Sequence, residues 1–310
     1  MRLLRGLGHL PANLRCVATI GNFDGIHTGH QALLRALNAN AKAMDLPSLV
    51  IIFEPQPKEF FAKGQAPARL TNLREKLQAF AHFEVDYVLC LPFNQRLRSL
   101  SALDFIQTVL VQGIGLKHLI VGDDFRFGHD RSGDFTLLHQ QGQTLGFKVN
   151  DTDTVVEQGE RISSTRVRDA LAQGNLGVAQ ALLGRPFSMS GRVAFGRQLG
   201  RKLNTPTANI LVKRQRLPLS GVFAVSAQDE QNGQQFLGVA SLGIKPTITD
   251  IPEPSLEVHL FNYAGNLYHR HLRVEFVAKI RDEKKFSDLA ELQRAIDADK
   301  HAAKAILQIQ

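Results

Sequence analysis

The chain has 310 residues, about twice the usual length of a single domain, so its length favours two folded modules. Hydrophobic residues make up 44% of the sequence and charged residues 21%, which excludes a wholly disordered or fibrous protein. No apolar run approaches the roughly 18 residues that a membrane-spanning helix requires, and no secretory signal is expected in segment 1–14. The cysteines, Cys16 and Cys90, stand in apolar surroundings, which is typical of reduced thiols in a cytoplasmic protein.

The net charge of +8 is unevenly distributed along the chain. No acidic residue occurs between Asp169 and Asp229, a stretch that contains the basic residues Arg185, Arg192, Arg197, Arg201, Lys202, Lys213, Arg214 and Arg216. A stretch of this kind attracts polyanions, which include nucleotides, nucleic acids and acidic lipid headgroups. The alternative interpretation is a basic face that is simply solvated.

The first half of the chain alternates short apolar runs with segments of helical periodicity. The runs predict strands at Cys16–Ile20, Ser48–Phe53, Tyr87–Leu91, His118–Val121 and Phe147–Asn150. The periodic segments predict helices at Gly29–Met44, Asn72–Phe83, Ala102–Ile114, Thr136–Leu145 and Ser164–Ala172. Buried strands that alternate with helices are typical of a parallel sheet with helices on both faces, so the first module is predicted to be α/β.

The pattern changes near residue 185, where short strands separated by Gly, Pro and Asn turns replace the helices. These strands are predicted at Ser188–Val193, Gly221–Gln228, Phe236–Ser241, Ser255–Phe261 and Leu272–Ile280. They indicate a small antiparallel barrel, followed by a helix at Phe286–Gln308 with Ser287 as its cap. We therefore expect two domains, residues 1–185 and residues 186–310.

The segment Gly21–His30 has the pattern of a phosphate-binding turn: a strand ends, glycines follow, and a helix begins. His27 and His30 are three residues apart at the helix start, so both imidazoles can reach one group. Aimed at an α-phosphate, they would stabilise charge as pyrophosphate leaves. Zinc ligation by the two histidines and a glycine-rich turn with incidental histidines are the alternatives.

Two further segments share features of a phosphate or ligand site. Arg161–Arg168 places hydroxyl groups and arginines at another helix start, where a plain Ser/Thr cap is the alternative. Val121–Gly128 lies at a strand end, where parallel sheets bind ligands. Phe125 and Phe127 could flank a flat ring there, although core packing explains either one equally well.

The acid-free stretch contains Gly191–Arg201, in which three glycines and interleaved arginines form a loop that can close over a polyphosphate. Thr207 and Asn209 offer the oxygen ligands that Mg²⁺ prefers. On an alternating strand, Glu257 and His259 point to one face, so the Glu257 carboxylate could deprotonate an alcohol for attack on a γ-phosphate. An ordinary turn and a solvated strand face are the alternatives.

Five segments occur in order along the first half of the chain: Gly21–His30, Phe53–Pro57, Arg69-Leu70, Phe125–Gly128 and Ile162–Arg166. Together they resemble the adenylyltransferase half of bacterial bifunctional riboflavin kinase/FMN adenylyltransferases (FAD synthetases). The resemblance implies a nucleotidyltransferase fold with a Rossmann-like parallel sheet, in which His27 and His30 contact the ATP phosphates. The residues that it assigns to ATP binding are Gly21, Asn22, Phe23, Asp24, Gly25, Ser163, Ser164, Thr165, Arg166 and Arg168. Those that it places near the flavin are Asp124, Phe125, Arg126 and Phe127.

Four segments follow in the second half of the chain: the glycine-rich run Gly191–Arg201, Pro206–Asn209, Leu256–Leu260 and Arg281–Phe286. Together they resemble the riboflavin kinase half of the same enzymes. This resemblance implies a six-stranded antiparallel barrel with a terminal helix, Mg²⁺–ATP on Thr207 and Asn209, and Glu257 as the base for the ribityl 5′-hydroxyl. The residues that it assigns to ATP binding in the kinase are Gly191, Gly196, Gly200, Arg201, Thr207 and Asn209. The chain departs from the family at Asn204 and Thr205, where Gly-Phe is usual, and at His269, where glycine is common.

The sequence therefore predicts an enzyme that phosphorylates riboflavin with ATP, giving FMN and ADP, and then adenylylates FMN with a second ATP, giving FAD and pyrophosphate. Mg²⁺ is the expected metal, and no redox cofactor, nucleic acid or membrane is required. One alternative is an FMN adenylyltransferase whose barrel binds flavin without kinase activity, which the retention of Thr207, Asn209 and Glu257 opposes. Another is an RNA-binding protein, which the absence of tryptophan and the presence of only three tyrosines oppose. The sequence leaves the oligomeric state open.

Overall fold

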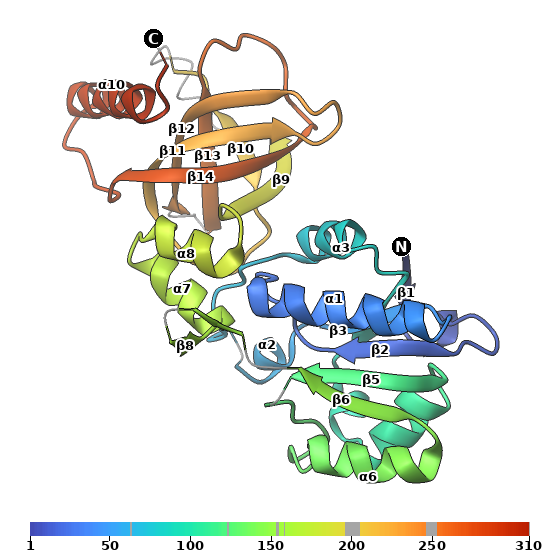
Figure 1. Ribbon diagram of the computed structural model, residues 1–310. Coiled ribbons are helices and arrows are strands. Elements are labelled where there is room, and N and C mark those ends of the chain that lie inside the picture. Colours follow the sequence, from blue (N-terminus) through green and yellow to red (C-terminus); the bar gives the residue numbers. More distant parts are fainter. Residues whose placement is uncertain are drawn as a thin grey trace. The chain divides into compact units, whose positions relative to one another are not determined.

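The computed structural model describes residues 1–62, 64–122, 124–152, 155–157, 159–195, 205–245 and 253–309. It contains two compact units, and each is described separately. The first consists of Met1–Pro67 and Lys76–Ser163, and the second of Ala68–Glu75 and Ser164–Gln310. Figure 1 labels many of the helices and strands of the two units.

The first unit is built on a six-stranded parallel sheet with the strand order β1-β4-β3-β2-β5-β6. Its strands are β1 (Arg2–Arg5), β2 (Cys16–Ile20), β3 (Ser48–Glu54), β4 (Tyr87–Pro92), β5 (Leu116–Gly122) and β6 (Lys148–Thr152). The prediction of a parallel α/β module is thus confirmed. The edge strand β1 was not predicted, because a four-residue strand with an arginine at each end carries no recognisable apolar run.

Helices cover both faces of this sheet. Alternate strand residues, including Ala18, Ile51 and Leu89, share one apolar cluster with α5 (Ala102–Phe105), the π-helix η2 (Ile106–Val111) and α6 (Phe135–Leu145). Strand side chains alternate between faces, so the intervening buried residues, such as Val17 and Val50, face the other side. There α1 (Thr28–Ala43) packs against β2 and β3 and buries Leu33, Leu34 and Leu37. The region predicted as one helix at Ala102–Ile114 is thus α5 followed by η2.

The remaining elements of this unit are short. They are η1 (Leu7–His9), α2 (Pro57–Ala62), α4 (Gln95–Arg98) and the hairpin of β7 (Val156–Glu157) and β8 (Glu160–Arg161). The helix α3 (Leu73–His82) contributes residues to both units.

The strand order reverses between β2 and β5, and this reversal positions a ligand site. From β2 the chain moves outward through β3 and β4, and it then returns to add β5 and β6 on the opposite side of β2. Parallel sheets bind ligands beyond the carboxyl ends of the strands at such a switch point. Gly21–His30 follows β2, and the loop at Asp124–Phe127 follows β5, so both segments flank this point.

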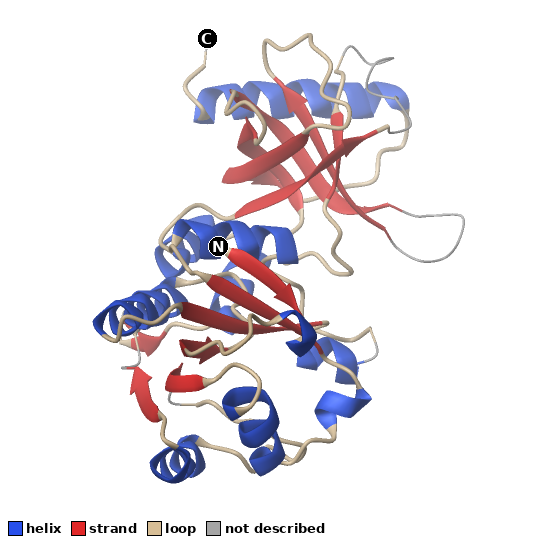
Figure 2. Ribbon diagram, turned by 90° about the vertical axis from the view of Figure 1, so that its right-hand side faces the viewer, coloured by secondary structure: helices blue, strands red, loops and turns tan. Residues whose placement is uncertain are grey.

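The second unit contains a closed barrel with the strand order β10-β13-β12-β11-β14-β9, whose neighbours all pair antiparallel. Its strands are β9 (Ser188–Ala194), β10 (Ala208–Leu211), β11 (Gly221–Asp229), β12 (Gln235–Lys245), β13 (Glu253–Leu260) and β14 (His271–Arg281). Figure 2 shows how these strands curve around the barrel interior. The six strands confirm the predicted barrel, although β10 was missed because it is only four residues long.

The described residues of this unit also form the helices α7 (Ser164–Ala172), α8 (Leu176–Leu183) and α10 (Leu289–Ile306). Helix α10 packs against β11, β12 and β14 (Figure 1). Asp299, on α10, forms a two-pronged ion pair with Arg281 of β14 at 2.8 and 2.7 Å. The predicted cap of this helix was wrong by one residue. Asp288 caps α10 by accepting the backbone N–H of Glu291, whereas Ser287 donates to the Glu291 carboxylate.

The segment Ala68–Glu75 is part of the second unit although it lies early in the sequence. The buried guanidinium of Arg214 donates to the carbonyl oxygens of Arg69 and Leu70 and pairs with Glu75 at 2.7 Å. The Glu75 carboxylate also accepts the backbone N–H of Ser190, at the barrel strand β9, at 2.7 Å. The segment is therefore fastened to the barrel by a buried charged network, which the sequence pattern did not indicate.

Candidate active sites

The loop after β2 has an unusual backbone. Phe23 and Ile26 adopt positive φ angles of 47° and 44°, and Gly25 lies between them at 85°. A positive φ is unfavourable for a bulky residue, and such conformations concentrate at ligand sites. The buried Phe23 ring packs edge-on against Phe80 at 5.4 Å, so core packing holds the turn in this shape.

His27 and His30 lie face to face at the start of α1. Their rings stack with centroids 3.7 Å apart and an interplanar angle of 18°. His27 is the N-cap residue, and its Nδ1 accepts the backbone N–H of His30 at 3.3 Å. Because Nδ1 is an acceptor, the neutral His27 ring carries its proton on Nε2. The pair therefore presents a hydrogen-bond donor at a helix N-terminus, where the helix dipole favours an anion.

Gly29 leaves room for this arrangement. A Cβ atom at residue 29 would lie 3.2 Å from Nδ1 of His27 and 4.0 Å from the carbonyl oxygen of Ile162. A side chain there would require the His27 ring to shift by a few tenths of an ångström. The same distances show that the second predicted motif, which contains Ile162 and Ser163, approaches the first motif at Gly29.

The surroundings of His30 disfavour its charged form. Burial lowers the pKa of His30 well below 6.5, and the neighbouring His27 and Lys76 lower it further. Among the described residues, buried Nδ1 of His30 and Oδ1 of Asn22 have no hydrogen-bond partner in the protein. Buried polar atoms are rarely left in this state, so they mark a place where a ligand can complete the hydrogen bonds.

The loop after β5 carries the residues predicted to lie near the flavin. Asp124 and Arg126 are exposed, and Asp124 forms an ion pair with Arg161 at 2.9 Å. The rings of Phe125 and Phe127 stack on each other at 5.4 Å, and Phe127 is buried against Phe105. That spacing is too small for a third ring between them, so a flat ligand would contact the half-buried Phe125 rather than insert between the two.

The remaining predicted ATP-binding residues divide between the two units. Ser163 ends the first unit, whereas Ser164, Thr165, Arg166 and Arg168 begin α7 in the second. Within the second unit, Nε of Arg168 donates to the carbonyl oxygen of Ala68 at 2.7 Å.

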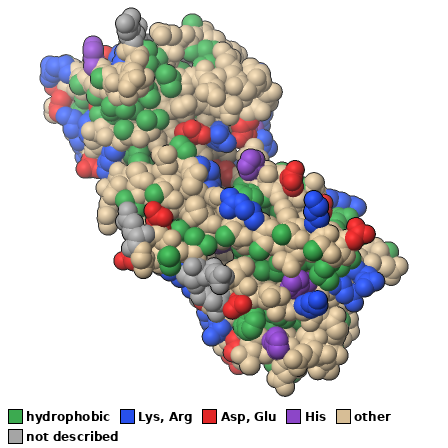
Figure 3. Space-filling view, viewed as in Figure 1, with side chains coloured by type: hydrophobic (Ala, Val, Ile, Leu, Met, Phe, Trp, Pro, Cys, Tyr) green, Lys and Arg blue, Asp and Glu red, His purple; other side chains and the backbone are tan. Residues whose placement is uncertain are grey.

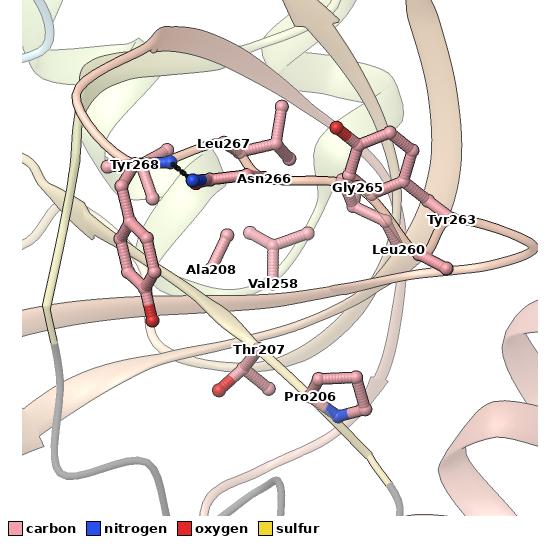
Figure 4. Close-up of a pocket in the computed structure, with 12 residues that line it drawn as sticks. Pro206, Thr207, Ala208, Val258, Leu260, Tyr263, Gly265, Asn266, Leu267 and Tyr268 are labelled. Atoms are coloured by element: carbon pink, nitrogen blue, oxygen red, sulfur yellow. Dashed lines mark hydrogen bonds between the residues drawn. The ribbon is translucent and has the colours of Figure 1, made fainter.

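The barrel contains a pocket of about 620 Å³, which is within the usual range for small-molecule and cofactor sites. Residues that line it include Thr207, Ala208, Val258, Tyr263 and Tyr268. In Figure 4 the rings of the two tyrosines lie on opposite sides of Ala208 and Val258, with Thr207 below them. The lining thus combines apolar and aromatic side chains with polar groups, which include the Thr207 hydroxyl and the Asn266 amide, and this combination suits a flat ring system that bears an alcohol chain.

Thr207, Asn209 and Glu257 come together beside this pocket. The Thr207 hydroxyl donates to Oε2 of Glu257 at 3.3 Å. Asn209 lies directly opposite Glu257 in the pairing of β10 with β13. Thr207 is two residues before Asn209, so the side chains of Thr207 and Asn209 are on the same side of the chain. Three oxygen-bearing side chains therefore lie at one position on the barrel.

The alternation predicted around Glu257 is confirmed. Leu256, Val258 and Leu260 are buried, whereas Glu257 and His259 are partly exposed. Nδ1 of His259 lies 2.9 Å from the carbonyl oxygen of Pro206, and burial lowers the pKa of His259.

The departure at His269 has a backbone explanation. His269 has a φ angle of 68°, in the left-handed region that favours glycine, and its N–H donates to the carbonyl oxygen of Val193 at 2.9 Å. Its neighbour Tyr268 stacks at 3.9 Å on Phe195, which is 63% exposed. The chain thus keeps the turn that glycine would favour.

Part of the predicted kinase site lies outside the described residues. Gly196, Gly200 and Arg201 belong to this part, whereas Gly191 lies in β9, where a Cβ atom would come within 2.3 Å of the Leu211 carbonyl oxygen. Gly191 therefore permits the close approach of β9 and β10.

The sequence did not indicate Tyr263 or Lys76, because single tyrosines and lysines outside a motif carry no recognisable signal.

On the face shown in Figure 3, Lys and Arg side chains form separate patches with Asp and Glu side chains between them. No group of three or more His, Cys, Asp or Glu residues that could hold a metal ion occurs in the described part of the chain. Nor does any described helix have the length and apolar character needed to cross a membrane.

The fold and these sites define a two-part enzyme that handles nucleotides and phosphate groups. The FAD synthetase family model matches residues 10–166, and the riboflavin kinase model matches residues 183–307. The chain is 52% identical to a bifunctional riboflavin kinase/FMN adenylyltransferase from Pseudomonas fluorescens, covering 99% of this chain and 98% of the relative. It is 48% identical to the enzyme of that name from Escherichia coli K12, with coverage of 98% and 97%.

The chain belongs to the bifunctional riboflavin kinase/FMN adenylyltransferase family. The prediction of two transferase activities is confirmed, and a kinase-inactive barrel is not favoured, since both family models match. A solved structure from Streptococcus pneumoniae, named as a macrolide-efflux protein, has a TM-score of 0.80 and 27% identity, and covers 97% of this chain and 98% of that one.

Proposed function

We propose that FMN adenylylation takes place at the switch point of the parallel sheet, with His27 and His30 at the centre of transfer. A phosphate oxygen of FMN attacks the α-phosphorus of ATP. The bond from that phosphorus to the oxygen bridging to the β-phosphate breaks, and pyrophosphate leaves with the electron pair. The observation that carries this proposal is the stacked pair at the N-terminus of α1, which can donate hydrogen bonds to the phosphate oxygens as charge develops on them.

The ATP that reacts here would be held by both predicted motifs. The turn of Gly21, Asn22, Phe23, Asp24 and Gly25 offers backbone N–H groups close to the helix start. Further contacts would come from Ser163, Ser164, Thr165, Arg166 and Arg168. The exposed Asp124 and Arg126 and the half-buried Phe125 would lie nearer the flavin, with Phe127 supporting Phe125 from the core.

Riboflavin phosphorylation is proposed to occur at the barrel pocket, with Glu257 as the base. The ribityl 5′-oxygen attacks the γ-phosphorus of ATP, its proton passes to the Glu257 carboxylate, and the bond to the β–γ bridging oxygen breaks as ADP leaves. The hydrogen bond from Thr207 to Glu257 beside an aromatic-lined pocket carries this assignment. Gly196, Gly200 and Arg201 are proposed to bind the ATP phosphates, and Gly191 would support this site from its position in the paired strand β9.

The residues beside the pocket fit a magnesium ion. Mg²⁺ prefers oxygen ligands and commonly binds through one or two protein groups together with substrate phosphates. Thr207 and Asn209 would supply the protein oxygens, next to Glu257. Bound there, the ion would neutralise charge on the ATP phosphates.

We further propose that residues 1–185 and 186–310 are the functional domains and that the enzyme works in the cytoplasm. The decisive experiment incubates the pure protein with riboflavin, ATP and Mg²⁺ and separates riboflavin, FMN and FAD by chromatography. FMN followed by FAD is the expected result. If only supplied FMN is converted, the assignment of kinase chemistry to the barrel pocket is wrong.

A further inference from the structure

The loop between β13 and β14 forms one wall of the barrel pocket. Six consecutive residues of this loop line the cavity: Tyr263, Ala264, Gly265, Asn266, Leu267 and Tyr268. In the upper part of Figure 4, the Asn266 side chain accepts the backbone N–H of Tyr268 at 2.9 Å. None of these six residues belongs to a helix or strand, so the shape of the 263–268 loop depends on contacts with its neighbours.

Aromatic packing holds the two tyrosines of the loop. The Tyr263 ring packs edge-on against Phe236 of β12, with 4.9 Å between the ring centroids. The Tyr268 ring stacks on Phe195 at 3.9 Å, and Phe195 itself is 63% exposed. The contact at the Tyr268 end is therefore made to a solvent-exposed ring, so that end needs a further anchor.

Arg270 joins the end of the loop to the barrel. Its backbone N–H donates to the carbonyl oxygen of Leu267 at 3.0 Å, and its carbonyl oxygen accepts the N–H of Val193, in β9, at 2.8 Å. Leu267 and Val193 both line the pocket. The position of Arg270 therefore determines two points of the pocket lining.

Asp229 holds the Arg270 side chain. It is the last residue of β11 and is 1% exposed, and its Oδ2 pairs with Nη2 of Arg270 at 2.6 Å. Its Oδ1 accepts the backbone N–H of Gln231 at 2.9 Å. A carboxylate that is buried this completely is stable only when it is paired and hydrogen-bonded, and charge-assisted hydrogen bonds are stronger than those between neutral groups. The ion pair therefore fixes Arg270 to the end of β11.

We propose that Asp229 and Arg270 are positioning residues for riboflavin phosphorylation. The pair holds the 263–268 loop in place as the wall against which the flat ring of a substrate packs. This inference rests on the proposed function of the barrel pocket. Riboflavin and ATP are both substrates of this step, and both carry a flat ring. Because the pair acts through the loop, its loss should weaken substrate binding and leave the chemistry at Glu257 unchanged.

The test compares Asp229→Asn, Arg270→Gln and the double variant with the unchanged full-length chain. The rate of FMN formation is measured over a range of riboflavin concentrations and over a range of ATP concentrations. Asn can still accept the N–H of Gln231, so the turn is retained while the charge that holds Arg270 is lost. Each single variant should raise KM for riboflavin, for ATP or for both by about threefold or more, with kcat within about twofold of its original value.

The double variant should resemble the single variants, because all three lose the same contact. Arg273→Gln is the matched control, since it removes a more exposed ion pair, with Glu275, on the same strand β14. It should leave both KM values unchanged. FAD formation from supplied FMN is the internal control and should be unchanged in every variant.

Unchanged KM values in both single variants would overturn the inference, as would a fall in kcat at constant KM. Effects that simply add in the double variant would show that the two side chains act independently. Lower thermal stability with unchanged KM values would mean that the pair is only structural. If Asp229→Asn does not fold, Arg270→Gln still provides the test, because the Arg270 side chain is 33% exposed.

Tyr268→Ala separates this inference from the proposed function of the pocket. If this variant leaves the KM values for riboflavin and ATP unchanged, the pocket does not bind a substrate ring, and the proposed function is wrong. If Tyr268→Ala raises a KM value while Asp229→Asn and Arg270→Gln do not, the pocket is correctly assigned and only the role of the ion pair is wrong.

Discussion

Glu75 and Arg214 form a buried ion pair across 139 residues of sequence, with 2.7 Å between Oε2 and Nη2. The Arg214 side chain is fully buried and also donates to three carbonyl oxygens, those of Arg69, Leu70 and Val212. The other Glu75 oxygen accepts from the backbone N–H of Ser190. A guanidinium group that is buried this completely is tolerated because it is paired with a carboxylate and each of its three nitrogens donates a hydrogen bond.

Breaking this pair should destabilise the second unit strongly. Glu75→Ala leaves the Arg214 charge buried and unpaired, so we expect a loss of about 3–5 kcal/mol in the free energy of unfolding. Urea unfolding, followed by circular dichroism, measures the change. Arg273→Ala is the control, because Arg273 is 47% exposed and pairs with Glu275, which is 30% exposed, and an ion pair at the surface contributes about 0–1 kcal/mol. Equal effects of the two substitutions would contradict the assigned role of the buried network.

Replacing either histidine with alanine should separate the two activities. Loss of one donor to the developing phosphate charge should lower FAD formation by about 10²–10³-fold. FMN formation from riboflavin should continue at its normal rate, since the barrel carries that step. Chromatography of the products from riboflavin checks both results in one reaction. A similar decrease in FMN and FAD formation would show that the division of labour is wrong.

Replacing Glu257 with Gln should give the opposite pattern. The amide can still accept a hydrogen bond from Thr207 but cannot take the alcohol proton at neutral pH, so FMN formation should fall by about 10²–10⁴-fold. Adenylylation of supplied FMN should be unchanged. Thr207→Ser, which keeps the hydroxyl, is the control and should retain most kinase activity. Normal FMN formation in the Glu257→Gln variant would remove Glu257 from the role of base.

The thiol of Cys16 should be unreactive in the folded protein. Burial raises its pKa to about 12, and its Sγ donates to the carbonyl oxygen of Ile114. Since the thiolate is the reactive form, almost none is present at pH 8, and the side chain is also inaccessible. Burial likewise raises the pKa of Cys90. Labelling with iodoacetamide at pH 8 should modify neither residue until denaturant is added, and rapid labelling of the native chain would contradict this burial.

The local patterns in the sequence were sufficient to predict both fold classes and much of the two sites. Apolar runs and helical periodicity report which residues are buried over a few neighbours, and for this reason Cys16–Ile20 and Ser164–Ala172 were predicted with the bounds that the structure shows. A glycine-rich turn between a strand and a helix is similarly local, so His27 and His30 could be recognised. Resemblance to a family identified Thr207, Asn209 and Glu257, but their cross-strand arrangement depends on the register of β10 and β13.

Other features depended on packing between distant segments. The stacking of Phe125 on Phe127 determines that a flat ligand cannot enter between them, although the spacing of the residues allowed it. The pairing of Glu75 with Arg214 and the burial of Lys76 place charges in the interior, where sequence patterns predict apolar residues. Such charges are stabilised by partners brought together by the fold, and a pattern read along the chain contains no information about those partners. The sequence by itself determined which chemistry the protein carries, whereas the tertiary structure decided which buried charges surround that chemistry.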